Sequence, residues 1–344
     1  MQLEKNILRI ARLSLACVFM VVIAGSVVRI TGSGMGCPDW PFCFGYVIPP
    51  VSAEPLTFSE GREFSKGQMI IANDTLWVAN SDLVAGATFN QQDWHKYPKH
   101  DYAVFNATHT WIEYINRLAT GLLGFPCMLL FAISIVHARR KKSWLTFSLS
   151  TLTLTGIGFE AWLGKLVVDG NLKENSITWH MLGTLFIIAM LVAIISLHSV
   201  AQKRKFNSTL RVAALSMLVL CVAQVVLGTQ VREEVDVLAK NIDNRSLWMA
   251  QLSNMFIIHR SMSYTILALF AWLFYLNRKH AHGLWEVKWI LVLLINEIAV
   301  GVILSYFDMP AIAQPMHLLL GVVLFAVAWR LFIRTSFTES NAAG

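Results

Sequence analysis

Charged side chains are scarce in this sequence of 344 residues, and this scarcity limits the kinds of protein that it can encode. Only 14% of the residues are Asp, Glu, Lys or Arg, whereas soluble domains contain about 25%. A globule of this length needs a charged exterior, and these residues are too few to provide one. The composition therefore excludes a soluble enzyme, a disordered chain and a nucleic-acid-binding protein, despite a net charge of +7.

Apolar residues instead make up 56% of the chain, and the mean hydropathy is +0.55. A membrane-spanning helix needs about 20 mostly apolar residues. The stretches that meet this requirement are 8–30, 109–136, 145–168, 177–201, 209–231, 252–276, 286–306 and 312–334. We therefore predict an all-α membrane protein with eight transmembrane helices. The first is expected to be retained, because no small-residue cleavage site follows it.

The positions of the basic residues predict the orientation of these spans. Sixteen of the 28 lysine and arginine residues lie near the N-terminus, in the loops after spans two, four and six, or at the end of span eight. By the positive-inside rule these segments face the cytoplasm, so both termini are expected to be cytoplasmic. The expected location is a bacterial-type cytoplasmic (inner) membrane.

The first outer segment, from about 36 to 108, is long and polar, and loops of this length are either functional or disordered. Within it, residues 68–80 predict a hairpin around Asn73 and Asp74. Cys37 and Cys43 flank the sequence CPDWPFC on the predicted outer side, where disulfides persist. Their spacing leaves open whether they form a structural clip or a redox-active pair.

The two halves of the chain resemble each other. Sixteen residues separate Gly164 from His180, and sixteen also separate Gly301 from His317. Small residues recur in all membrane helices, but the identical spacing to a histidine favours a true repeat. The other matching positions are Gly25 and Gly228, Arg29 and Arg232, Asn116 and His259, and Arg117 and Arg260. We predict two pseudo-repeated four-helix bundles in parallel orientation, residues 1–205 and 206–344.

Histidines within the predicted spans mark a candidate metal site. An ionisable group inside a bilayer costs about 2.5–3.5 kcal/mol on insertion scales. His180, His259 and His317 lie at similar depth in even-numbered spans. His259 and His317 share the C-terminal half, which predicts two axial ligands of a haem iron between facing helices. The alternative is interhelical hydrogen bonding by unrelated histidines.

Four arginines at the outer ends of the spans run against the inward bias of basic residues: Arg29, Arg117, Arg232 and Arg260. Guanidinium groups pair carboxylates bidentately, so haem propionates would explain them. The alternative is that these side chains extend to the membrane interface. Glu113 precedes Asn116 by three residues, so the two share one face of the second span.

Five motifs occur in a fixed order: RITGSGMGCPDWPFCFG (29–45), WIEYINR (111–117), WHMLG (179–183), IHR (258–260) and PMHLLLG (315–321). In these motifs, and over essentially all eight spans, the sequence resembles the haem A synthase family. The resemblance implies that the C-terminal half holds haem b through His259 and His317. It also implies that the N-terminal half oxidises the C8 methyl group of haem O to a formyl group, giving haem A for terminal oxidases.

The resemblance further implies roles for residues of the N-terminal half. Glu113 matches a family glutamate that is essential to catalysis, and Cys37 and Cys43 match the outer cysteine pair, expected as a disulfide. His180 would bind the iron of haem O. The same substrate site would include Asn116, Arg29 and Arg117. Arg232 and Arg260 would face the propionates of haem b. Contacts with haem O synthase and with cytochrome oxidase assembly are further expectations.

The sequence departs from the family pattern at three points. Asn116 replaces the usual histidine of the second span, and Asn is a poor iron ligand. His109 lies seven residues earlier, which is about 10 Å along a helix and too far for the same iron. The C-terminal half lacks an outer cysteine pair, and the first outer loop is longer than usual.

Two other functions compete with this interpretation. A membrane b-type cytochrome would carry electrons between two stably bound haems, but Asn116 leaves one half without a complete ligand pair. A transporter built from the same repeat would show broken helices near the midplane. The polar residues here lie close to the predicted outer surface instead.

Overall fold

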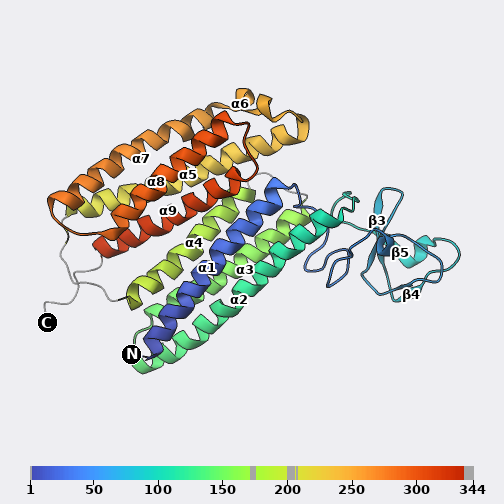
Figure 1. The fold of residues 1–344 in the computed structure, drawn as a ribbon. Coiled ribbons are helices and arrows are strands. Elements are labelled where there is room, and N and C mark those ends of the chain that lie inside the picture. Colours follow the sequence, from blue (N-terminus) through green and yellow to red (C-terminus); the bar gives the residue numbers. More distant parts are fainter. Residues whose placement is uncertain (1, 171–175, 200–205, 207, 337–344) are drawn as a thin grey trace. The chain divides into compact units, whose positions relative to one another are not determined.

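The computed structural model describes residues 2–170, 176–199, 206 and 208–336 (Figure 1). Eight long helices in this part of the chain coincide with the predicted spans. They are α1 (Gln2–Ile30), α2 (Ala107–Lys141), α3 (Leu145–Asp169), α4 (Ser176–His198), α5 (Ser208–Asn241), α7 (Asn254–Lys279), α8 (Trp285–Tyr306) and α9 (Ala313–Ser336). The end of the predicted span 177–201, the basic residues 203–205 and the predicted boundary at 205 lie outside the described residues.

Seven of these helices are long and apolar enough to cross a membrane, which makes the chain a multi-pass membrane protein. The remaining one is α3, a helix of 25 residues that is less apolar because it carries serines, threonines, Glu160 and Lys165. Several of its hydroxyl groups form hydrogen bonds: Ser150 contacts Ser134 of α2 at 2.7 Å, and Thr151 donates to the Phe147 carbonyl oxygen at 2.9 Å. The eighth span and the cytoplasmic location of the termini stay predictions.

Contacts along the chain define two compact units that cut across α1, α2 and α3. The first, here called the helical unit, comprises Met1–Ile23, Leu122–Glu160 and Ile177–Gly344. The second, here called the loop unit, comprises Ala24–Gly121 and Ala161–Ser176. The predicted division into halves at 205 stays a prediction.

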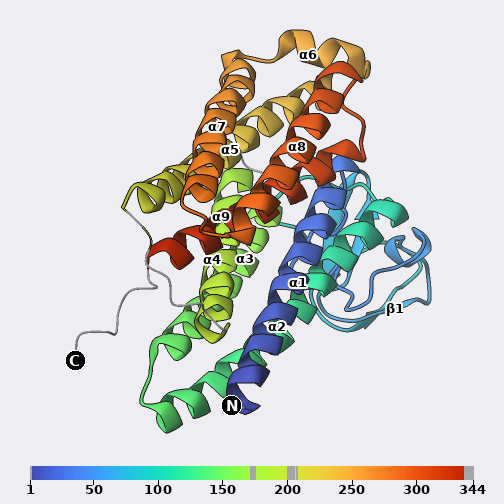
Figure 2. The same ribbon diagram turned by 60° about the vertical axis from the view of Figure 1, so that its left-hand side comes forward.

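The helical unit contains a four-helix bundle of α5, α7, α8 and α9 (Figures 1 and 2). Helices α5 and α8 each pack against both α7 and α9, so α7 and α9 lie diagonally across the bundle. Met217, Phe270, Ile290 and Leu331 are among its buried side chains. Beyond the predicted span, α5 continues to Asn241, and a short connection, η3 (Arg245–Leu247) and α6 (Trp248–Gln251), leads to α7.

The predicted outer loop is folded and belongs to the loop unit. A three-stranded antiparallel sheet has the order β2 (Met69–Ala72), β3 (Thr75–Ala79), β5 (Trp94–Lys96), and β1 (Glu63–Phe64) pairs with β4 (Leu83–Val84). Two short turns of 3₁₀-helix, η1 (Glu54–Leu56) and η2 (Gln91–Asp93), complete it.

The turn between β2 and β3 confirms the predicted hairpin in residues 68–80. Asn73 and Asp74 have φ angles of 50° and 53°, and this two-residue hairpin turn requires positive φ at both positions. Aromatic side chains consolidate the sheet, with the rings of Phe64 and Trp94 centred 5.1 Å apart. The alternative of a disordered loop is therefore excluded.

Candidate functional site

The predicted ligands His259 on α7 and His317 on α9 lie beside each other inside the C-terminal bundle. Their ring centres are 6.2 Å apart, and the ring planes are inclined by 81°. An iron held by one nitrogen of each imidazole, at about 2 Å per bond, would place the ring centres about 6 Å apart. The spacing of the two rings therefore fits a shared iron.

Glycines on the neighbouring helices leave room for these rings. A Cβ atom at Gly228 of α5 would lie 3.2 Å from His259 Cε1, and one at Gly301 of α8 would lie 3.5 Å from His317 Cε1. The Nδ1 atoms of both histidines are buried and have no hydrogen-bond partner among the described residues. Two imidazoles with buried ring nitrogens, backed by glycines, form a donor set that would fit a haem.

Within the described ranges, no group of three or more His, Cys, Asp or Glu side chains could hold a bare metal ion.

His180 on α4, the predicted ligand of the N-terminal half, lies in the helical unit and contacts Glu160 of α3. Its Nδ1 is 2.6 Å from Glu160 Oε2. A Cβ atom at Gly183, one turn further along α4, would overlap Glu160 Oε1. The glutamate therefore lies flat against α4 next to the imidazole.

His317 has a comparable neighbour in Glu297 of α8. Glu297 Oε1 lies 3.3 Å from His317 Nδ1, which is an ion-pair distance. A Cβ atom at Gly321 would lie 3.2 Å from the same oxygen. Sequence reasoning missed both Glu160 and Glu297. The sequence did contain a signal for these two residues, because each glutamate precedes its histidine by the same 20 positions.

The predicted catalytic residue Glu113 lies in the loop unit, where only 4% of its surface is exposed. Its Oε2 accepts a hydrogen bond from the backbone N–H of Cys37 at 2.8 Å, and its Oε1 accepts one from Arg117 at 2.5 Å. Cys37 forms a disulfide with Cys43, which confirms the predicted pairing. The segment between the cysteines therefore holds the carboxylate of Glu113 in place.

Arg117 binds this segment with its remaining donors. Its guanidinium donates to the carbonyl oxygens of Asp39 and Phe42, each at 2.7 Å, and of Cys37 at 3.0 Å. A propionate would have to compete with these acceptors. The Asp39 carboxylate accepts a hydrogen bond from the backbone N–H of Phe44. Burial raises the pKa of Asp39 above its usual value, although its backbone hydrogen bonds and the charge of Arg117 lower it.

The start of α2 contacts the same segment closely. Thr110 Oγ1 donates to the carbonyl oxygen of Gly36 at 2.8 Å. A Cβ atom at Gly36 would overlap the His109 carbonyl and would lie 2.8 Å from the Thr110 nitrogen. Only glycine permits this approach, so the family-like sequence GMGC places Cys37 where its N–H reaches Glu113.

The other predicted residues have varied surroundings. Asn116 Oδ1 is buried without a hydrogen-bond partner in the described part of the chain, and a Cβ at Gly25 would lie 3.8 Å from it. Arg29 is half-buried in the same unit. Arg232 binds Asp236 at 2.6 Å and also Gln314, whereas Arg260 is exposed.

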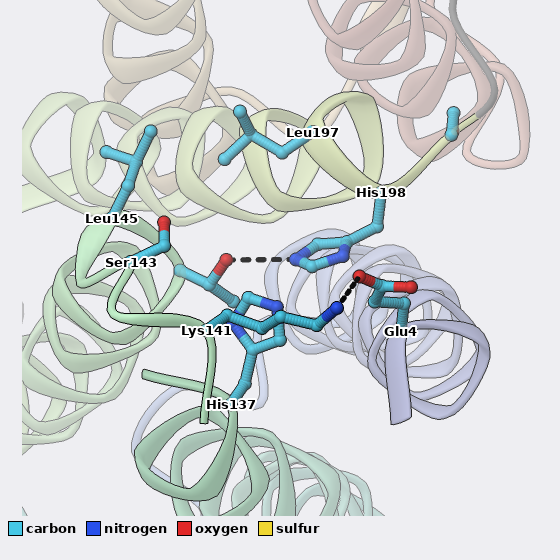
Figure 3. A pocket seen from close by; sticks show the side chains of 9 residues that line it. Glu4, His137, Lys141, Ser143, Leu145, Leu197 and His198 are labelled. Atoms are coloured by element: carbon cyan, nitrogen blue, oxygen red, sulfur yellow. Dashed lines mark hydrogen bonds and ion pairs between the residues drawn. The ribbon is translucent and has the colours of Figure 1, made fainter. Parts of the chain in front are cut away.

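A separate cavity of about 450 Å³ lies in the helical unit, next to His198 at the end of α4 (Figure 3). His137 and His198 line it, with Thr146 Oγ1 2.9 Å from His198 Nε2 and Lys141 3.8 Å from Glu4. None of the predicted site residues lines this cavity.

Comparison with known proteins adds to this geometry. A family model described as "Cytochrome oxidase assembly protein" (COX15-CtaA) matches residues 9–74 and 80–329, which is most of the chain. The chain belongs to this family. A protein of Shewanella oneidensis named "Heme A synthase" is 23% identical to this chain over 181 residues. That stretch covers 53% of this chain and 42% of the relative, so the chain spans less than half the length of that relative. The predicted resemblance to the haem A synthase family is confirmed.

Proposed function

We propose that this protein is a haem A synthase, which oxidises the C8 methyl group of haem O to a formyl group. Membership of the COX15-CtaA family and the name of the Shewanella relative support the proposal. The observation that carries it is the pair of imidazoles of His259 and His317, with ring centres 6.2 Å apart inside the C-terminal bundle.

In this proposal His259 and His317 hold haem b, which when bound supplies one-electron transfer. Two strong ligands from the chain would suit electron transfer better than oxygen chemistry. Gly228 and Gly301 allow the rings to lie against the backbones of α5 and α8. Arg232, fixed by Asp236, contributes positive charge at the predicted outer end of α5, and Arg260 does so on α7.

The N-terminal half receives haem O as substrate. His180 binds the iron of haem O through the ring nitrogen that does not face Glu160. Asn116 occupies the position that matches His259 and is a poor ligand for iron, so it leaves one coordination position without a strong ligand. The half with one strong ligand performs the oxidation, and the half with two transfers electrons.

Glu113 acts as the proton carrier in the oxidation. Counted with water as the source of oxygen, the substrate methyl group becomes an alcohol and then a hydrated aldehyde, and each step takes up one water and gives two protons and two electrons. The electrons pass to an external electron acceptor, and the hydrated aldehyde loses water to give the formyl group. Each oxidation releases protons, and the carboxylate of Glu113, which accepts hydrogen bonds from Cys37 and Arg117, retains lone pairs that can accept them. General acid–base assistance of this kind contributes about 10²- to 10⁴-fold in rate.

Matching contacts support the proposed repeat of two four-helix halves. Glu160 faces His180 as Glu297 faces His317. Gly25 lies next to Asn116, and Gly228 lies next to His259. These pairs come from corresponding helices, which is the outcome expected if one ancestral bundle was duplicated.

The test is pigment analysis of membranes from cells that make haem O but no haem A of their own, with and without this chain. Haem A in the extract supports the synthase. Bound haem b without haem A would identify the alternative, a b-type cytochrome that only carries electrons. No bound haem would contradict both.

We also propose that the protein lies in a bacterial cytoplasmic membrane with both termini in the cytoplasm, and that it contacts haem O synthase and the cytochrome oxidase assembly machinery. Reporter fusions to each terminus test the topology. Co-purification with tagged haem O synthase from detergent tests the contact, with no enrichment over an unrelated membrane protein counting against it.

A further inference from the structure

Two buried glutamates face two of the proposed iron ligands. Glu160 Oε2 lies 2.6 Å from His180 Nδ1, and Glu297 Oε1 lies 3.3 Å from His317 Nδ1. In both pairs the glutamate precedes the histidine by 20 residues and comes from the preceding helix. The same arrangement therefore occurs once in each half of the chain.

Neither carboxylate is satisfied by its other surroundings. Glu160 Oε1 and Glu297 Oε2 are buried and lack hydrogen-bond partners among the described residues. The two side chains are only 14% and 20% exposed. Carboxylates inside membrane spans are costly and mark functional positions. The ring nitrogen of the adjacent histidine is the polar atom that each of these carboxylates faces.

Glycines in the histidine helices accommodate both carboxylates. Gly183 follows His180 by one turn of α4, and a Cβ there would overlap Glu160 Oε1. Gly321 follows His317 by one turn of α9, and a Cβ there would lie 3.2 Å from Glu297 Oε1. In each half the glycine lets the carboxylate rest on the helix backbone at the height of the ring.

We infer that Glu160 and Glu297 are positioning residues for the iron ligands His180 and His317. The inference rests on the proposed function, since it requires these histidines to bind iron. A carboxylate that accepts the Nδ1 proton fixes the tautomer with Nε2 free for the metal, orients the ring and makes it a more basic ligand. His317 Nδ1 lies 3.3 Å from the Glu297 carboxylate, whereas no carboxylate forms an ion pair with His259 among the described residues, so the inference makes the two ligands of haem b differ in basicity.

The test in the C-terminal half compares the midpoint potential of haem b in purified full-length protein. The variants are Glu297→Gln, Glu297→Asp and the matched control Glu234→Gln. Glu234 lies on α5, where its carboxylate accepts hydrogen bonds from Ser253. We expect the potential to rise in E297Q, because a neutral amide no longer favours the ferric state. The midpoint potential is expected to stay closer to the original value in E297D and to be unchanged in E234Q.

Equal potentials in E297Q and E234Q would overturn the inference, and so would equal shifts in E297Q and E297D. A variant that loses its haem is also informative. Loss of haem b from E297Q with retention in E297D supports the positioning role. Loss of haem b from both E297Q and E297D would overturn a role for the negative charge of Glu297.

The test in the N-terminal half uses Glu160→Gln with haem O bound. Resonance Raman spectra of the ferrous protein report the iron–histidine stretching frequency, which rises with the basicity of the ligand. We expect a lower frequency in E160Q than in the original protein. An unchanged frequency would overturn the inference for His180.

Failure of the inference is distinguishable from failure of the proposed function. His317→Ala tests the ligand assignment alone, and full retention of haem b in H317A would contradict the proposed function whatever E297Q shows. If H317A loses haem b while E297Q keeps its content and potential, the ligand stands and the positioning role is overturned. Size-exclusion profiles of each variant in detergent show that the chain has folded.

Discussion

Replacing Arg117 by methionine tests the link between the disulfide segment and the predicted catalytic carboxylate. The guanidinium binds the carbonyl oxygens of Asp39, Phe42 and Cys37 and the carboxylate of Glu113. The Arg117 side chain is 16% exposed and that of Glu113 is 6% exposed, so water screens the pair little. Removing one partner of a buried ion pair costs about 3–5 kcal/mol. We expect Arg117→Met to destabilise the loop unit by this amount.

Trypsin cleavage of the outer loop in detergent measures this change. Each 1.4 kcal/mol changes an equilibrium constant about tenfold, so the opened population rises by about two to three and a half orders of magnitude. The cleavage rate follows that population when opening and closing are fast relative to cleavage. Lys96→Met, at an exposed position of β5, serves as the matched control. This substitution removes the trypsin site at residue 96, and we expect the rate of cleavage at the remaining sites to be unchanged.

A double variant separates the charge from the packing. Arg117→Met leaves the Glu113 carboxylate buried without its ion-pair partner, and adding Glu113→Gln removes that charge. A neutral amide costs less to bury than a carboxylate, so the double variant regains part of the lost resistance to trypsin. Unchanged cleavage in R117M would refute the reasoning, as would a double variant no more resistant than the single one.

Three further changes have defined outcomes. Glu113→Gln alone keeps the haem b spectrum, while haem A formation collapses; unchanged haem A content in membrane extracts would remove Glu113 from catalysis. Asn116→His adds a second strong ligand, so ferric haem O becomes low-spin by electron paramagnetic resonance and haem A yield falls; a high-spin signal would contradict the proposed place of Asn116. Gly36→Ala forces a Cβ against the His109 carbonyl and destabilises the loop unit by about 1–3 kcal/mol. Faster trypsin cleavage of G36A would confirm this destabilisation. Cleavage at the original rate would show that α2 shifts to make room for the added methyl group.

Hydropathy and turn chemistry predicted much of the fold, because both depend on local sequence. The long apolar stretches became helices, and the Asn73–Asp74 turn became a hairpin. The weaker apolarity of α3 has a local cause in its serines and threonines. The extension of α5 to Asn241 was missed, since the polar residues after 231 end the apolar stretch but continue the helix.

The surroundings of the candidate residues depend on contacts between distant segments and were harder to predict. The propionate role expected for Arg117 stays a prediction, and its hydrogen bond to Cys37, 80 residues earlier in the sequence, was not foreseen. Glu160 and Glu297 were overlooked because each is paired through a neighbouring helix. Their identical spacing from a histidine was the available signal, and it becomes meaningful once α3 and α4, and α8 and α9, are seen together.

The central claim is that this chain converts haem O into haem A, and the most direct measurement is the identity of the haem after turnover. Purified protein loaded with haem b is supplied with haem O, an electron acceptor and air. The haems are then extracted, separated and identified by mass spectrometry. We expect haem O to disappear and haem A, carrying a formyl group, to take its place while haem b remains. Recovery of unchanged haem O beside intact haem b would contradict it.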